Sequence, residues 1–146
     1  MEKINLLIVH AHFVVANSLV YWFNGDSRFN VHAVCTNNLI AFDYLSEESL
    51  GVAIIDVSCG PIPGEILVKQ LKRKNPRVRI LCLSSAADPE DLANKCIEAG
   101  ASCFLLKDQG FVELSGAILE LVEADSRIAE RRLWPPPSAS RMKRRV

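Results

Sequence analysis

Three residues able to take part in group transfer each stand directly after a run of apolar residues. They are a carboxylate, Asp56, a hydroxyl, Ser84, and an ammonium group, Lys107. If the apolar runs are parallel strands of one sheet, their carboxyl ends meet at one edge, where ligands gather. A carboxylate is a nucleophile, and a hydroxyl and an ammonium group can hold anionic oxygens beside it. The three residues therefore indicate a phosphoacceptor pocket.

A fourth apolar run, residues 6–9, ends differently, in His10-Ala11-His12. Asp56 is then the only carboxylate that the pattern places near the pocket. Magnesium is a hard cation that prefers near-octahedral oxygen ligands, commonly from one or two carboxylates. We therefore expect magnesium to bind weakly or not at all, and we predict no cofactor and no bound metal.

His10 leaves three interpretations open. It can be a neutral, hydrogen-bonded imidazole at the end of a strand. It can instead carry a charge beside Asp56 and stand in for a cation, because a nearby carboxylate raises the pKa of an imidazole. Finally, His10, Asp56 and His12 could bind a softer metal such as zinc. In that case the chain must turn, because the two rings of a His-x-His sequence point to opposite sides of an extended strand.

These residues need a sheet to bring them together, and the pattern of the chain predicts one. Short β-branched apolar runs alternate with segments of helical periodicity, and the apolar runs lack the polar alternation of half-exposed strands. This pattern indicates an α/β fold, with helices on both faces of a buried parallel sheet. The predicted strands lie near 4–9, 29–35, 51–56, 78–83 and 102–106, and the predicted helices near 13–24, 38–47, 64–75, 89–99 and 111–130.

The 146 residues suit one domain, which we place at residues 1–126. Residues 127–146 are expected to be a helix extension followed by a proline-rich linker or tail, with seven basic side chains against one acidic. Since the whole chain has net charge zero, the tail carries +6 and the domain −6, which argues against the domain itself as a nucleic-acid-binding surface. The five cysteines lack metal-ligand spacing, and no apolar run nears the roughly 20 residues needed to span a bilayer. We expect a cytoplasmic protein with reduced thiols and no membrane contact.

Four features recur together in a known family: Asp56 after the third predicted strand, Gly64 eight residues later, Ser84 after the fourth, and the block from Gly100 to Asp108 that contains Lys107. With them, residues 3–126 resemble the receiver domain of bacterial response regulators, in particular the branch that includes NarL and FixJ. The resemblance implies a flavodoxin-like (CheY-like) doubly wound fold, with five parallel strands in the order 2-1-3-4-5 and five helices. It also implies that Asp56 is the phosphoacceptor and that Ser84 and Lys107 contact phosphoryl oxygens.

The departures from the family pattern bear on function. Receivers have two acidic residues directly after the first strand, where this chain has His10 and Ala11, and a proline four residues after the acceptor, where it has Gly60. Phosphoryl transfer depends on a divalent cation that neutralises charge on the moving group. Loss of the acidic pair therefore indicates a degenerate receiver. Phe104 aligns with the aromatic residue that switches rotamer in working receivers, although a phenylalanine in a buried strand is first a core residue.

The first and last predicted helices carry more apolar residues than one core-facing stripe needs. Trp22 lies in the first helix, and Val112 and Leu119 lie to one side of the inward stripe of the last. Because these helices are neighbours in the implied fold, we predict a homodimer through this face. The alternative is a monomer with scattered exposed apolar residues, which are common.

The resulting hypothesis is a regulatory and dimerisation module that works largely without magnesium-dependent phosphorylation. The NarL and FixJ resemblance implies a transcriptional regulator, in which only an effector domain outside this chain would contact DNA. One alternative is a receiver still phosphorylated on Asp56 by a histidine kinase. A second is a pseudo-receiver that binds a small ligand or a metal. An independent enzyme is not expected, because the chain has no glycine-rich nucleotide loop, nucleophile elbow or paired acids.

Overall fold

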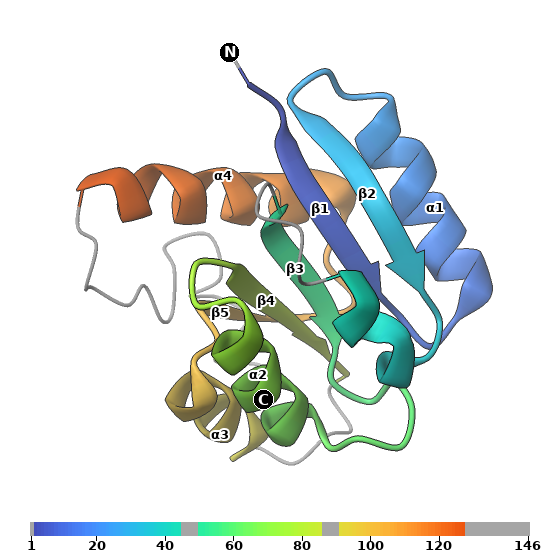
Figure 1. The fold of residues 1–146 in the computed structure, drawn as a ribbon. Coiled ribbons are helices and arrows are strands. Elements are labelled where there is room, and N and C mark those ends of the chain that lie inside the picture. The colour runs from blue at the N-terminus through green and yellow to red at the C-terminus, as the bar shows by residue number, and fades with distance from the viewer. Residues whose placement is uncertain (1, 45–49, 86–90, 128–146) are drawn as a thin grey trace.

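The structure is a computed structural model of the 146-residue chain, and it describes residues 2–44, 50–85 and 91–127. Within these ranges, strands and helical segments alternate, with the helices packed around one sheet (Figure 1). The strands are β1 (Ile4–Val9), β2 (Phe29–Cys35), β3 (Leu50–Asp56), β4 (Arg79–Ser84) and β5 (Cys103–Leu106). The helices are α1 (Phe13–Asn24), the 3-10 helix η1 (Asn38–Tyr44), α2 (Gly64–Lys74), α3 (Leu92–Ala99) and α4 (Phe111–Arg127).

The strands form one parallel sheet in the order β2-β1-β3-β4-β5. This order confirms the predicted flavodoxin-like, doubly wound fold. The chain moves outward from β1 to β2 and then returns past β1 to β3, so the direction of winding reverses between β1 and β3. Ligands in such sheets bind at the carboxyl edge beside this reversal. Asp56 is the last residue of β3 and therefore stands at that edge.

Alternate residues of the central strands supply two separate hydrophobic layers. On β1, Leu7 packs into the layer with α2 and α3, whereas the next residue, Ile8, packs into the layer with α1 and α4. The same alternation holds on β3, where Ala53 lies in the first layer and Ile54 in the second. Because both faces of the sheet are covered, these strands are unbroken apolar runs in the sequence.

One predicted helix has a different form. An α-helix was expected near 38–47, but the structure has the 3-10 helix η1 over Asn38–Tyr44, and residues 45–49 lie outside the described ranges. Two asparagine side chains bond to backbone groups there: Leu39 N–H donates to Asn37 Oδ1 (2.8 Å), and Asn38 Nδ2 donates to the Ile62 carbonyl (2.9 Å). Asparagine side chains that bond to nearby backbone favour turns over α-helix. The described residues thus hold four α-helices and one 3-10 helix.

The last two predicted helices begin close to the expected residues. α3 begins at Leu92, while residues 89 and 90 of the predicted segment lie outside the described ranges. It ends at Ala99 and is followed by the capping residue Gly100, whose φ of 123° is readily adopted only by glycine. α4 extends to Arg127, and the proline-rich tail that follows is likewise outside the described residues.

All five cysteines are free thiols, and all are buried. Burial raises the pKa of Cys35 to about 11, and it also raises the pKa of Cys103. Since the thiolate is the reactive form, such thiols are poor nucleophiles at neutral pH. Among the described residues, no helix combines the length and apolar character needed to cross a membrane.

Candidate functional site

The carboxylate of Asp56 is fully buried at the carboxyl edge of the sheet. β3 lies between β1 and β4, so the ends of both neighbouring strands flank this side chain. The β3 backbone stays bonded to β4 one residue beyond Asp56, where Val57 N–H donates to the Leu83 carbonyl (3.0 Å). A buried carboxylate is costly unless it is paired and hydrogen-bonded. Its partners therefore define the chemistry of the pocket.

Lys107 and Ser58 surround one oxygen of this carboxylate. The Nζ of Lys107 lies 2.8 Å from Asp56 Oδ1. Ser58 donates to the same oxygen twice, from its backbone N–H (3.0 Å) and from its hydroxyl (2.8 Å). The Ser58 hydroxyl in turn accepts a hydrogen bond from Lys107 Nζ (3.0 Å). The three groups form a closed triangle in which Lys107 supplies the positive charge.

The other carboxylate oxygen faces the end of β1. Its hydrogen bond comes from the backbone N–H of Ala11, which lies 3.0 Å from Asp56 Oδ2. The side chain of His10 is also buried, and its Nδ1 lies 3.7 Å from the same oxygen. Ala11, which occupies the position of the second acidic residue of the family, thus contacts Asp56 only through its backbone N–H.

The hydrogen bonding of His10 favours the neutral interpretation. His12 N–H donates to His10 Nδ1 (3.1 Å), so this nitrogen carries no proton and cannot donate to Asp56. Burial lowers the pKa of His10, the Asp56 carboxylate offsets this only in part, and the Lys107 charge lowers the pKa further. The cation beside Asp56 is therefore Lys107, and the imidazole is neutral at physiological pH.

The pKa of Asp56 lies below its usual value. Burial by itself raises this pKa, but hydrogen bonds from Lys107, Ala11 and Ser58 to the ionised carboxylate outweigh that effect. Asp56 is consequently an anion at neutral pH, held by donors of the protein itself.

Ser84 and Phe104 lie where the resemblance places them in the sheet. Ser84 ends β4 and is buried, and its hydroxyl donates to the Ser85 carbonyl (3.2 Å). Lys107 N–H donates to the Ser84 carbonyl (2.7 Å), which sets these two residues side by side at the edge. Phe104 is buried in the layer with α2 and α3, as expected of a core residue. A role of Ser84 with phosphate, or of Phe104 in switching, stays a prediction.

The loop after Asp56 is shaped by Asn38 of η1. Its side chain donates to the Ile62 carbonyl (2.9 Å) and accepts from Ile62 N–H (3.4 Å), which clamps the loop. Gly60 has a φ of 85°, and a Cβ on it would lie 2.6 Å from Asn38 Oδ1. Proline holds φ near −65°, so it could not adopt this conformation. The geometry explains why a glycine replaces the usual proline of the family.

Ser58 and Asn38 are the site residues that the sequence interpretation missed. A signal for Ser58 was present, because an aspartate often bonds to the backbone two residues further on, and a serine there can add its hydroxyl. No comparable signal exists for Asn38. It lies in a segment that the sequence assigns to a helix, and only the tertiary fold brings it to Ile62.

The described residues do not support the zinc interpretation. The rings of His10 and His12 are near each other, with centroids 5.7 Å apart. However, no group of three or more His, Cys, Asp or Glu side chains in these ranges is placed to hold a metal ion. Zinc sites take three or four protein ligands.

The residues predicted for a dimer face do not all lie on the surface. Trp22 is 55% exposed and Val112 is 75% exposed. Leu119, in contrast, is partly buried and packs against the layer with α1 and α4, so it is a weaker candidate for that face. α1 and α4 do meet, because Phe111 stacks on Trp22 (ring centroids 5.9 Å apart) and packs edge-on against Phe23 (4.9 Å).

The sheet order and the pocket at the end of β3 agree with the family that the sequence resembles. Residues 6–119 match the response regulator receiver domain family, which is more than half of the chain. The chain belongs to this family. It is therefore a receiver domain, the module that receives the signal in two-component systems.

Individual relatives of this receiver domain are distant. It is 24% identical over 117 residues to the protein-glutamate methylesterase/protein-glutamine glutaminase of Azospirillum brasilense, covering 80% of this chain and 30% of that protein. The chain thus spans less than a third of that relative. Among solved structures it resembles the isolated receiver domain of RcsB from Salmonella enterica serovar Typhimurium, with a TM-score of 0.78, 19% identity and coverage of 97% and 99% of the two chains. It also resembles a receiver domain described as that of NarL from Mycobacterium tuberculosis, with a TM-score of 0.76, 22% identity and coverage of 84% and 98%.

Proposed function

We propose that this chain is an atypical receiver domain, a regulatory and dimerisation module of a transcriptional regulator that works largely without magnesium-dependent phosphorylation. The observation that carries the proposal is the set of protein donors on Asp56. Lys107 and Ser58 cover Oδ1, and Ala11 N–H covers Oδ2. The carboxylate is thereby held in one arrangement by groups of the protein itself.

The residues of the pocket do not fit a magnesium ion. Asp56 is the only carboxylate among the pocket residues described above, while His10 and Ala11 offer no side-chain oxygen where the family has two acids. We therefore predict that magnesium binds weakly or not at all.

A phosphorylation assay tests this proposal. After incubation with magnesium chloride and acetyl phosphate, we expect intact-mass spectrometry to find no phosphoryl adduct on the unsubstituted chain. The double variant His10→Asp/Ala11→Asp restores the acidic pair, and we expect it to gain the adduct because a magnesium ion then has oxygen ligands. Adding Asp56→Ala to that double variant should abolish the gain.

The opposite result supports the main alternative. Phosphorylation of Asp56 by a histidine kinase is supported by two features of the pocket. The Lys107 ammonium lies beside Asp56, and Ser84 ends the neighbouring strand. An adduct on the unsubstituted chain that Asp56→Ala removes would overturn the atypical interpretation in favour of this one.

The wider role of the protein is also a proposal. The receiver portion carries net charge −6, which repels phosphate groups, so we propose that DNA is contacted only through an effector domain outside this chain. We propose a histidine kinase as the upstream partner and the cytoplasm as the location. We expect the protein to act by regulation and not as an independent enzyme. The similarity to receivers of RcsB and NarL supports this assignment.

For dimerisation, we expect the chain to have the mass of a dimer in sedimentation equilibrium at micromolar concentrations. Trp22→Glu and Val112→Glu should each shift the mass toward a monomer, because a charge buried in an apolar interface lacks a partner. Ile66→Glu is the matched control, since Ile66 is an apolar residue on α2 that is 44% exposed, away from α1 and α4. A monomeric unsubstituted chain, or a dimer unaffected by Val112→Glu, would contradict the dimer.

A further inference from the structure

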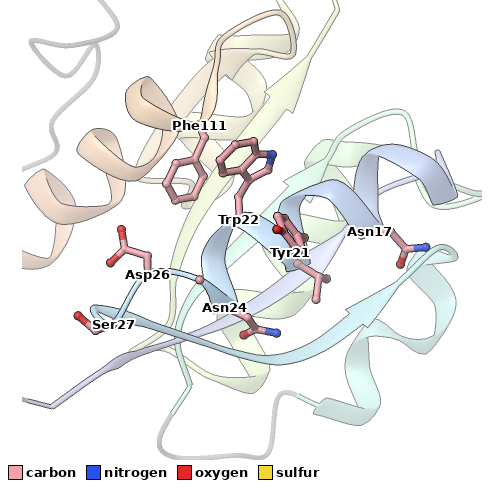
Figure 2. Close-up of a pocket in the computed structure, with 9 residues that line it drawn as sticks. Asn17, Tyr21, Trp22, Asn24, Asp26, Ser27 and Phe111 are labelled. Carbon is pink, nitrogen blue, oxygen red and sulfur yellow. The ribbon is translucent and has the colours of Figure 1, made fainter.

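The two ends of α1 have different surroundings. Its last turn lines a hollow in which Tyr21 and Trp22 lie beside Phe111 of α4, on the face that we assign to a second copy of the chain (Figure 2). Its first turn follows directly on β1, at the edge of the sheet that holds Asp56 (Figure 1). A change in the Asp56 pocket can therefore reach the start of α1.

Residues 10–12 join β1 to α1 and are bonded to both elements. His10 N–H donates to the Cys35 carbonyl (2.9 Å), which continues the pairing of β1 with β2. His12 N–H donates to the buried ring of His10 at Nδ1 (3.1 Å). The His12 carbonyl accepts from Ala16 N–H (2.8 Å), the first hydrogen bond of α1. The imidazole of His10 therefore links the end of β1 to the start of the helix.

The Nδ1 atom of His10 lies between two partners. In the neutral imidazole it accepts the hydrogen bond from His12 N–H. A protonated imidazole donates from both nitrogens and accepts from neither, so this bond is lost when Nδ1 takes up a proton. Asp56 Oδ2 lies 3.7 Å from the same atom, just beyond hydrogen-bond range, and has a lone pair besides the one that Ala11 N–H uses. A small movement of the ring would bring Nδ1–H to this oxygen.

The groups around His10 disfavour a proton on its ring in the observed arrangement. Burial is the largest effect and lowers the pKa of His10, whereas the Asp56 carboxylate raises it. Positive charges on Lys107 and His12 lower it further. The thiol of Cys35, at the end of β2, is neutral because burial raises its pKa to about 11. Acid therefore favours any other arrangement in which the ring binds the proton better.

We propose that mild acid switches the start of α1 through His10. A proton from the solvent adds to the lone pair of Nδ1, the hydrogen bond from His12 N–H breaks, and Nδ1–H donates to Asp56 Oδ2. Residues 10–12 then take a second arrangement, because the His12 backbone is no longer held to the ring.

The first turn of α1 carries this change to the surface. Phe13 is 67% exposed and Val14 is 76% exposed, and both directly follow His12. The inference thus names the proton as an input of the regulatory module proposed above. It rests on that proposal only for its biological use, because the exchange of hydrogen bonds needs neither a phosphoryl donor nor a divalent ion.

An NMR titration of the unsubstituted 146-residue chain tests the switch, in buffer without magnesium or acetyl phosphate. The pH is lowered from about 7.5 to about 5, which covers the ordinary range of imidazole titration. The ring nitrogen signals of His10 report its protonation, and we expect a midpoint below the usual value of 6.5. This measurement does not depend on the folding of any variant. Asp56→Asn should move the midpoint to lower pH, because the attraction of the carboxylate is lost.

A pair of variants then follows the hydrogen bond. His12→Gln removes the second imidazole but keeps the backbone N–H, so the N–H signal of residue 12 should still move with the midpoint of His10. Adding His10→Asn is the matched control, because its amide oxygen can replace Nδ1 as the acceptor and does not titrate. The N–H signal of residue 12 should then stay in place.

The proposal is overturned if the His10 ring stays neutral down to about pH 5. It is also overturned if the N–H signal of residue 12 fails to move with His10, or still moves in the double variant. Loss of all native signals over the same pH range would show global unfolding in acid and would exclude a local switch. A phosphoryl adduct in the assay above would contradict the proposed function but not this inference.

Discussion

Replacing Lys107 with methionine is expected to lower the free energy of unfolding by about 3 kcal/mol. The substitution keeps much of the side-chain length but removes the charge that lies 2.8 Å from the fully buried Asp56 carboxylate. A buried charge that loses its partner typically costs about 3–5 kcal/mol. The lower end of this range applies because the Lys107 side chain keeps 21% of its exposure to solvent. Urea unfolding at pH 7, followed by circular dichroism, measures the change.

The pH dependence of this effect follows from the pKa of Asp56. In the folded protein this pKa is below its usual value, so the ionised carboxylate contributes stability that is present above the unfolded pKa, about 3.9, and is lost as the pH falls through the folded pKa. Without Lys107, one of the hydrogen bonds that lower the pKa of Asp56 is lost, so this pKa rises. The stability difference between the unsubstituted chain and Lys107→Met should therefore be largest at neutral pH and become smaller in acid.

Two further variants check the cause of this loss. Lys95 pairs with Asp91 at 3.4 Å, but both side chains are more than half exposed, so Lys95→Met should change stability by less than about 1 kcal/mol. Combining Lys107→Met with Asp56→Asn removes the unpaired charge and should recover part of the lost stability. Equal losses for Lys107→Met and Lys95→Met would show that the pair with Asp56 is not a buried ion pair.

A second large effect is expected for Gly64→Ala at the start of α2. A Cβ on Gly64 would lie 2.7 Å from the Val57 Cβ and 3.0 Å from the Val57 carbonyl oxygen. These atoms belong to the backbone and a branched side chain next to Asp56, so they cannot move aside without displacing the end of β3. Overpacking of this kind costs about 1–3 kcal/mol. Urea unfolding gives the loss, and the N–H signal of Ser58 should report any shift of the pocket.

Gly116→Ala is the control for this prediction. Gly116 lies within α4, and a Cβ on it would have no atom within 4 Å. Alanine in a helix is more favourable than glycine by about 1 kcal/mol, so this variant should be as stable as the unsubstituted chain or more so. If Gly64→Ala were equally well tolerated, the close packing of α2 on Val57 would be contradicted.

The sequence was informative about Asp56 and Lys107 because both follow apolar strands, and parallel strands bring their carboxyl ends to one edge. That argument needs only the order of strands and helices, and the sheet order confirms it. It was less informative about η1, because the side chain of Asn38 is engaged by Ile62, which is remote in sequence. It also overestimated the exposure of Leu119, since helical periodicity alone does not define the edge of the buried stripe.

By itself, the sequence determined the sheet, the residues at its carboxyl edge and the loss of the acidic pair, because hydrophobic periodicity and residue type are local properties of the chain. The tertiary structure decided how those residues are bonded. The protonation state of His10 depends on the hydrogen bond that its Nδ1 accepts from the His12 N–H. The cation paired with Asp56 is Lys107 because the fold places its Nζ beside the carboxylate. Hydrogen bonds and ion pairs act over about 3–4 Å, and distances of that size between strands are set only when the whole sheet has packed.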